Sequence, residues 1–193
     1  MDELRAFLDL LAMLVLDPRT GLLIALLVAA AVIDVRTMRI PNWLTVGGLL
    51  CGLAVSASAA PRIMQGVGDS VAGALLGLGL LLPLWLVRVL GAGDVKLMAA
   101  VGAFLGPLPT LHALAYVAMA GGVAALLVAA WRGSLGRLLQ NVYFIVAVVR
   151  TPGGASVNGT VSPPVPSVGK LPYGLCICIG TVAFLLARQF GLT

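Results

Sequence analysis

Apolar residues gather along this chain in long runs, and each run ends at proline, glycine or a charged residue. A helix needs about 20 apolar residues to cross the hydrocarbon core of a membrane. The runs therefore predict six membrane helices, at about residues 18–38, 43–60, 70–90, 94–106, 110–131 and 171–190. The fourth run is the shortest, and its helical rise of roughly 20 Å is little for a full crossing.

The residues between the runs predict how the helices begin and end. Asp17 before Pro18 has the form of an N-cap followed by proline in the first turn. Pro41 ends the first run because the residue before a proline leaves helical geometry, and Asn42 is predicted to cap the second helix. Two glycines precede Asp94, which is predicted to cap the fourth helix.

Two further segments are predicted to lie at the membrane surface. Residues 1–17 are too short and too charged for a confident span, and they predict an interfacial or partly inserted helix. Residues 132–170 predict a cytoplasmic loop that carries an amphipathic helix at about 137–149 and a flexible Pro- and Gly-rich stretch. The chain shows no internal repeat, so residues 1–193 are predicted to form one integral-membrane domain.

The composition supports this interpretation. Hydrophobic residues make up 61% of the chain and charged residues 10%, whereas a soluble domain carries about 25% charged residues. We therefore expect an all-α, polytopic helical bundle whose partner is the lipid bilayer. The net charge of +5 is not concentrated in a basic run beside aromatic residues, so no nucleic-acid partner is expected.

The basic residues predict an orientation. Lys and Arg collect in cytoplasmic loops of membrane proteins. With the 35–42 loop on the cytoplasmic side, eight of the 12 basic residues fall on that side. They are Arg36, Arg39, Arg88, Lys96, Arg132, Arg137, Arg150 and Lys170. This topology places Asp34 and Asp94 at one membrane face and Asp69 at the other.

Acids at membrane depth are expensive and are candidates for function. Asp34 follows twelve uninterrupted apolar residues and lies at the C-terminal end of a helix, where it has no capping role. An ion pair with Arg36 or Arg39 is the structural alternative. For Asp94 the alternative is an ordinary helix cap.

Two carboxyl groups that share one proton can hydrolyse a peptide bond, because the ionised one activates water and the protonated one donates to the oxyanion. No competing catalytic set is present, since His112 stands alone in an apolar run. The cysteines lie inside apolar runs without the spacing of a metal site, so neither a metal nor another cofactor is expected.

Three segments together resemble the type IV prepilin peptidases, and in particular the short form that serves Tad-type pili. Residues 34–42, DVRTMRIPN, are similar to the family's D-x-R-x-x-x-I-P-N segment, and residues 91–96, GAGDVK, to its G-x-G-D-x-K segment. Residues 170–174, KLPYG, resemble its K-x-P-Y-G element before the last helix. The segments occur in order, with about 60 residues between the two aspartates, and span most of the chain.

The resemblance implies that Asp34 and Asp94 are the catalytic pair of a membrane aspartic endopeptidase. It implies removal of the short basic leader from Tad/Flp-like prepilins or pseudopilins, after a glycine, at the cytoplasmic face of the bacterial inner membrane. The matching residues implied to support the site or bind substrate are Gly91, Gly93, Lys96, Pro41, Asn42, Lys170, Pro172, Tyr173 and Gly174. The Cys-x-x-Cys insertion of long-form relatives is missing here, so methyl transfer is not expected.

Two other classes of function stay open at this point. Intramembrane acids and glycine-broken helices also suit a proton- or ion-coupled transporter subunit, although the two halves of the chain show no relation to each other. The third possibility is a non-catalytic assembly protein of a pilus or secretion system.

Overall fold

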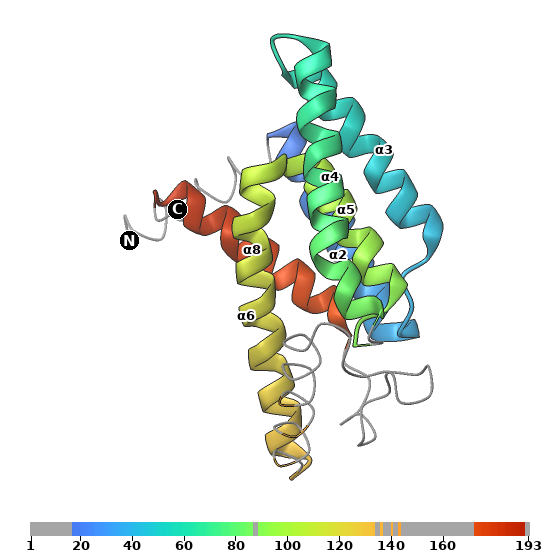
Figure 1. The fold of residues 1–193 in the computed structure, drawn as a ribbon, viewed down its shortest axis with the longest axis vertical. Coiled ribbons are helices and arrows are strands. Elements are labelled where there is room, and N and C mark those ends of the chain that lie inside the picture. Colours follow the sequence, from blue (N-terminus) through green and yellow to red (C-terminus); the bar gives the residue numbers. More distant parts are fainter. Residues whose placement is uncertain are drawn as a thin grey trace, which may run out of the picture.

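The computed structural model describes residues 17–86, 89–133, 136, 140, 143 and 172–191. Within this part the chain forms six helices of appreciable length and no strand (Figure 1). They are α2 (Pro18–Thr37), α3 (Asn42–Ala59), α4 (Ile63–Leu86), α5 (Ala92–Leu105), α6 (Pro107–Trp131) and α8 (Tyr173–Gln189). The predicted all-α class is confirmed.

Four of these helices, α2, α3, α4 and α6, are long and apolar enough to cross a membrane. Only 22–28% of the residues in their apolar windows are buried inside the bundle. The remaining apolar side chains face outward, as the lipid-facing surface of a membrane protein does. Helix α8 is apolar but shorter, with 17 residues. The predicted helical membrane bundle is therefore confirmed.

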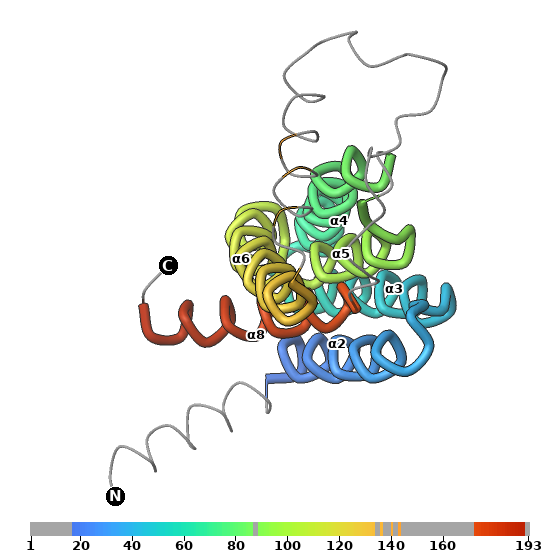
Figure 2. Tube along the Cα trace, turned by 90° about the horizontal axis from the view of Figure 1, so that it is seen from below, coloured from blue at the N-terminus to red at the C-terminus, as the bar shows by residue number. Residues whose placement is uncertain are grey.

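Helix α5 lies at the centre of the bundle, in contact with all five other helices (Figure 2). Ten of its 14 residues are buried. Its backbone touches that of α4 directly, because a Cβ on Gly73 would lie 2.2 Å from the Gly102 carbonyl oxygen. Only glycine permits that approach. A helix enclosed in this way can be shorter than the hydrocarbon core, provided that the bundle supplies partners for its ends.

Several predicted helix ends differ from the observed ones. Helix α4 begins at Ile63 rather than near residue 70, so Asp69 lies inside it. The helix continues through this glycine-containing stretch because Gly66 packs tightly against the Ser56 carbonyl of α3. Asp17 caps α2 as predicted, and its carboxylate accepts the N–H of Thr20 at 3.3 Å.

The predicted caps of α3 and α5 are also displaced. The N-cap of α3 is Pro41, and the Asn42 side chain bonds to another helix instead. Helix α5 begins at Ala92 with Gly91 as its N-cap, so Asp94 is the third helical residue. Asn42 thus has a partner on a distant helix, whereas Asp94 accepts the N–H of the N-cap residue Gly91.

Most of the two segments predicted to lie at the membrane surface falls outside the described residues. This applies to residues 1–16 of the predicted interfacial segment 1–17 and to the Pro- and Gly-rich stretch at 151–170. Of the amphipathic helix at 137–149, only residues 140 and 143 are described, and both are helical.

Candidate active site

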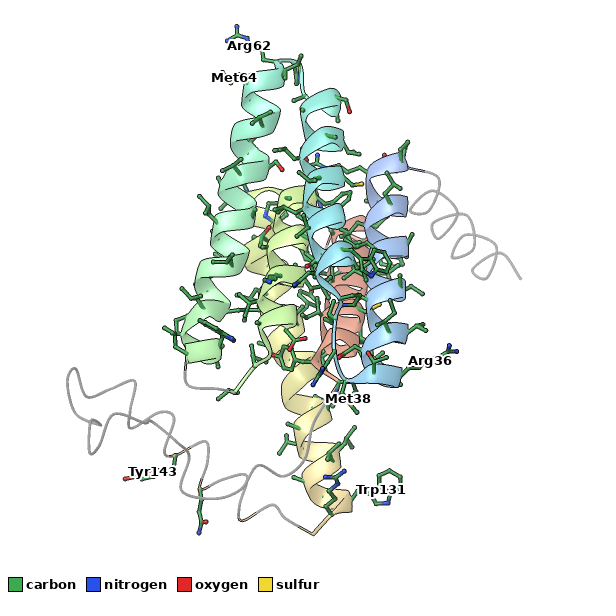
Figure 3. All side chains as sticks on the ribbon, turned by 90° about the vertical axis from the view of Figure 1, so that its right-hand side faces the viewer. Arg36, Met38, Arg62, Met64, Trp131 and Tyr143 are labelled. Carbon is green, nitrogen blue, oxygen red and sulfur yellow. The ribbon has the colours of Figure 1, made fainter. Side chains whose placement is uncertain are left out.

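Asp34 lies in the last turn of α2, with 5% of its surface exposed. The chain reverses directly after it. Met38 adopts the left-handed conformation (φ 51°), and its N–H donates to the carbonyl of Asp34 at 2.7 Å. Figure 3 shows Met38 at this end of the bundle and Arg62 at the opposite end.

The side chain of Asp34 reaches the start of α8. Its Oδ2 accepts the backbone N–H of Gly174 at 2.7 Å, across 140 residues of sequence. A Cβ on Gly174 would lie 2.9 Å from that oxygen. Arg36 and Arg39 are exposed, and neither forms an ion pair with Asp34 in the described part of the chain. The expected ion-pair alternative is therefore not seen.

Asp94 lies in the first turn of α5, with 8% of its surface exposed. Its Oδ2 accepts the N–H of Gly91 at 3.1 Å. In this bond the side chain of the third helical residue accepts the N–H of the N-cap residue. Asp94 therefore contributes to capping α5, as predicted, although it is not the N-cap itself. No described residue donates to the other carboxylate oxygen.

The two carboxyl groups come together between α2, α5 and α8. Asp34 and Asp94 lie close enough to interact electrostatically, and each also interacts electrostatically with Cys176. Each aspartate is anchored through Oδ2 by the amide of a glycine, and no described residue donates to either Oδ1.

The residues between α2 and α3 close over the start of α5. The Lys96 ammonium donates to the Asn42 side-chain oxygen at 2.9 Å, across 54 residues. Gly93 packs against Ile40, since a Cβ there would lie 3.0 Å from the Ile40 Cβ. The structure thus brings the predicted residues Pro41, Asn42, Gly93 and Lys96 to one place.

The start of α8 completes the site. Pro172 is the N-cap of α8, and its carbonyl accepts the Cys176 thiol at 3.9 Å. The ring of Tyr173 packs on α6, where a Cβ on Gly121 would lie 2.9 Å from the phenol oxygen. Lys170, the remaining predicted site residue, lies outside the described part of the chain.

Two contacts at this site were not predicted as site residues. Ile40 was part of a motif, yet no chemistry pointed to it. Gly121 stands in an apolar helix without any local signal. Among the described residues, no three His, Cys, Asp or Glu side chains lie together in a way that could hold a metal ion.

Comparison with known proteins gives a family match. The type IV leader peptidase family matches residues 21–126, which is more than half of the chain. This range contains both aspartates and the Asn42–Lys96 pair. It ends before Tyr173 and Gly174, so the contact of α8 with Asp34 lies beyond the matched region.

Individual proteins resemble the same region. A prepilin leader peptidase/N-methyltransferase of Pectobacterium carotovorum subsp. carotovorum is 36% identical over 124 residues, covering 58% of this chain and 40% of that protein. Proteins of the same name from Burkholderia pseudomallei (strain K96243) and Myxococcus xanthus (strain DK1622) are 39% and 34% identical. These matches cover 58% and 62% of this chain, and 38% and 37% of those proteins. The chain spans about two fifths of the length of these relatives, and no solved structure matches it.

Proposed function

The chain belongs to the type IV leader peptidase family, and we propose that it is a membrane aspartic endopeptidase in which Asp34 and Asp94 hydrolyse the peptide bond. One observation carries the proposal. Two buried carboxyl groups, from segments about 60 residues apart, lie within electrostatic reach of each other, and no described residue donates to the Oδ1 of either. Purely structural acids at this depth would have their oxygens satisfied by protein groups.

The reaction needs no group beyond the pair and a water molecule. The ionised carboxyl takes a proton from water as the water oxygen attacks the substrate carbonyl, and the protonated carboxyl donates to the developing oxyanion. The tetrahedral intermediate then collapses. The C–N bond breaks, the amine takes a proton, and the pair returns to its singly protonated state.

Two backbone amides hold the side chains of Asp34 and Asp94 in position. Gly174 and Gly91 each hold an Oδ2 atom, which leaves the two Oδ1 atoms to share the proton and the water. Groups that are held in position before the reaction do not reorganise during it. This anchoring explains why both aspartates stand beside glycine-containing segments.

The proposed substrates are prepilins or pseudopilins with a short basic leader, and Tad/Flp-like pilins in particular. The relatives named above are prepilin leader peptidases, and the short loop after Asp34 resembles the Tad-type form. Arg36, Arg39 and Lys96 lie at the aspartate end of the bundle, which the positive-inside rule assigns to the cytoplasmic face. We therefore propose cleavage at the cytoplasmic face of the inner membrane. Methyl transfer, the second activity in the relatives' names, is not part of the proposal.

A direct test incubates the purified protein, in detergent or liposomes, with a Flp-type prepilin and identifies the products by gel and mass spectrometry. We expect a single cut after the leader's glycine, at the junction with the hydrophobic helix. A prepilin in which a bulky residue replaces that glycine serves as the matched control. Folded protein that leaves Flp-type and other prepilins intact would contradict the proposal. A proton flux through the same liposomes would instead favour the transporter alternative.

A further inference from the structure

The loop between α2 and α3 is built so that Ile40 turns inward. Met38 reverses the chain in its left-handed conformation. The Thr37 hydroxyl donates to the carbonyls of Ile33 and Arg39, both at 2.9 Å, and so braces the turn. Pro41 restricts Ile40 to extended geometry. Arg39 is exposed as a result, whereas Ile40 has 9% of its surface exposed.

The Ile40 side chain touches the backbones that carry both halves of the site. Its Cβ would lie 3.0 Å from a Cβ on Gly93, the residue before Asp94. Its Cδ1 would lie 3.1 Å from a Cβ on Gly174, whose N–H holds Asp34. Both neighbours are glycines, so Ile40 meets backbone there rather than a side chain that could rotate away.

A second bond fixes the same loop to α5. Lys96 donates to Asn42, two residues after Ile40. The loop is thus held on the α5 side by Gly93 and Lys96. On the α8 side it is held through the end of the Ile40 side chain, so a change at that end acts selectively on the α8 contact.

From these contacts we infer that Ile40 is a positioning residue, a wedge that sets the start of α8 against α5 so that the Gly174 amide meets Asp34. The inference rests on the proposed peptidase function. Ile40 touches no reacting atom and acts through Gly174. Displacement of a catalytic group by about 1 Å can lower a rate on the order of a hundredfold, so loss of one methyl from the wedge is measurable.

Two substitutions separate the ends of this side chain. Ile40→Val keeps the Cβ against Gly93 and removes the δ-methyl that reaches Gly174, and we expect kcat to fall about tenfold with KM within about twofold. Ile40→Leu keeps a δ-carbon, so it should retain kcat within about threefold. Ile24→Val is the matched control, because it removes the same methyl from a partly buried Ile that packs against the core, ten residues before Asp34. It should leave kcat unchanged.

A double-mutant cycle tests the route through Gly174. In a Gly174→Ala background the amide contact is already disturbed, so Ile40→Val should lower kcat by no more than about twofold further. Two residues that acted independently would instead multiply their effects. A tenfold additional loss in that background, or a wild-type kcat for Ile40→Val, would overturn the inference.

Hydrogen exchange gives a measurement that does not depend on cleavage. Mass spectrometry of peptides covering residues 172–178 should show faster exchange in Ile40→Val than in wild type, and no change in Ile24→Val. Unchanged exchange in Ile40→Val would overturn the wedge even if cleavage were slowed. Faster exchange in a protein that cleaves no prepilin would retain the wedge and reject the peptidase proposal.

Discussion

The two ends of α5 differ in how their backbone groups find hydrogen-bond partners. The first and last turns of a helix carry backbone groups without intrahelical partners. At the C-terminal end, the hydroxyls of Ser56 and Ser70 both donate to the Ala103 carbonyl, at 2.9 and 2.8 Å. Arg19 donates to the Phe104 carbonyl and also, at 3.3 Å, to Ser56. At the N-terminal end, the Gly91 N–H donates to Oδ2 of Asp94, and no described residue donates to its Oδ1.

The difference separates a structural polar cluster from a chemical one. Around Arg19, donors from α2, α3 and α4 meet carbonyls of α5, and the cation suits the negative end of the helix. A cavity of about 460 Å³ also lies at that end, between Arg19, Leu23, Phe104 and Arg188. At the aspartate end, Asp34 and Asp94 each accept one backbone N–H through Oδ2, and no described residue donates to either Oδ1. Carboxylate oxygens without a described donor, rather than burial or a cavity, therefore distinguish the end of α5 where chemistry is proposed.

The most direct test of this comparison is to replace the carboxyl groups of Asp34 and Asp94 by amides. Asp34→Asn and Asp94→Asn should each lower prepilin cleavage by about a thousandfold or more, because an amide cannot ionise or hold the shared proton. The double variant should be no worse than either single variant, since the pair acts as a unit. Melting in detergent should confirm that all three variants fold.

Asp69→Asn is the matched control for the pair, because Asp69 lies near the α5–α6 turn at the other end of α5. It should keep wild-type cleavage. The pH–rate profile of the wild type should be bell-shaped, with limbs that belong to the pair rather than to one residue. Substantial cleavage by folded Asp34→Asn would make the aspartate end structural, like the Arg19 end.

The next effect in size concerns the approach of α8. Gly174→Val should lower cleavage about a hundredfold, because its side chain would overlap the carboxylate of Asp34 and displace it. Gly122→Val is the control, since nothing lies within 4 Å of the position where a Cβ on Gly122 would stand. Cleavage assays on equal amounts of inserted protein compare the two. Equal activities would show that the close approach of Gly174 to Asp34 is not needed for cleavage.

At the other end of α5 the expected loss is in stability. Arg19→Gln removes the donor to the Phe104 carbonyl and should lower the free energy of unfolding by about 1–3 kcal/mol. The cleavage rate per folded molecule should stay within about threefold of wild type. Arg62→Gln, at the exposed turn between α3 and α4, should change neither quantity. An inactive but fully stable Arg19→Gln protein would contradict the structural role of this end.

The smallest effect belongs to the exposed Lys96–Asn42 bond. Lys96→Met keeps most of the side-chain volume and removes the donor, and we expect about a threefold loss of cleavage. Asn42→Leu should cause a similar loss, and the double variant should add little to it. Fully multiplicative losses in the cleavage assay would show that each residue acts alone, for example on the substrate.

The sequence predicted what depends on local composition. The apolar runs predicted the helices, and proline and glycine predicted most of their ends. The two aspartates could be paired because the topology places them at one membrane face. Asp17 caps α2 as expected, because capping is decided within one turn of helix.

What it did not predict depends on contacts between distant segments. Asn42 bonds Lys96 rather than its own helix start, and α4 begins early because Gly66 packs on α3. Ile40 packs against Gly93 and Gly174, and Gly121 packs against the ring of Tyr173. Such pairings follow from the packing of the bundle, and neither composition nor periodicity reports them.

The bond between Asp34 and Gly174 has a consequence for how the protein is made. The two residues lie 140 positions apart, so a ribosome that has already delivered α2 to α6 has not yet produced the amide that anchors Asp34. On the proposed mechanism, the nascent chain is an incomplete protease while its first five described helices insert. On that mechanism its proteolytic competence begins only when the start of α8 reaches Asp34.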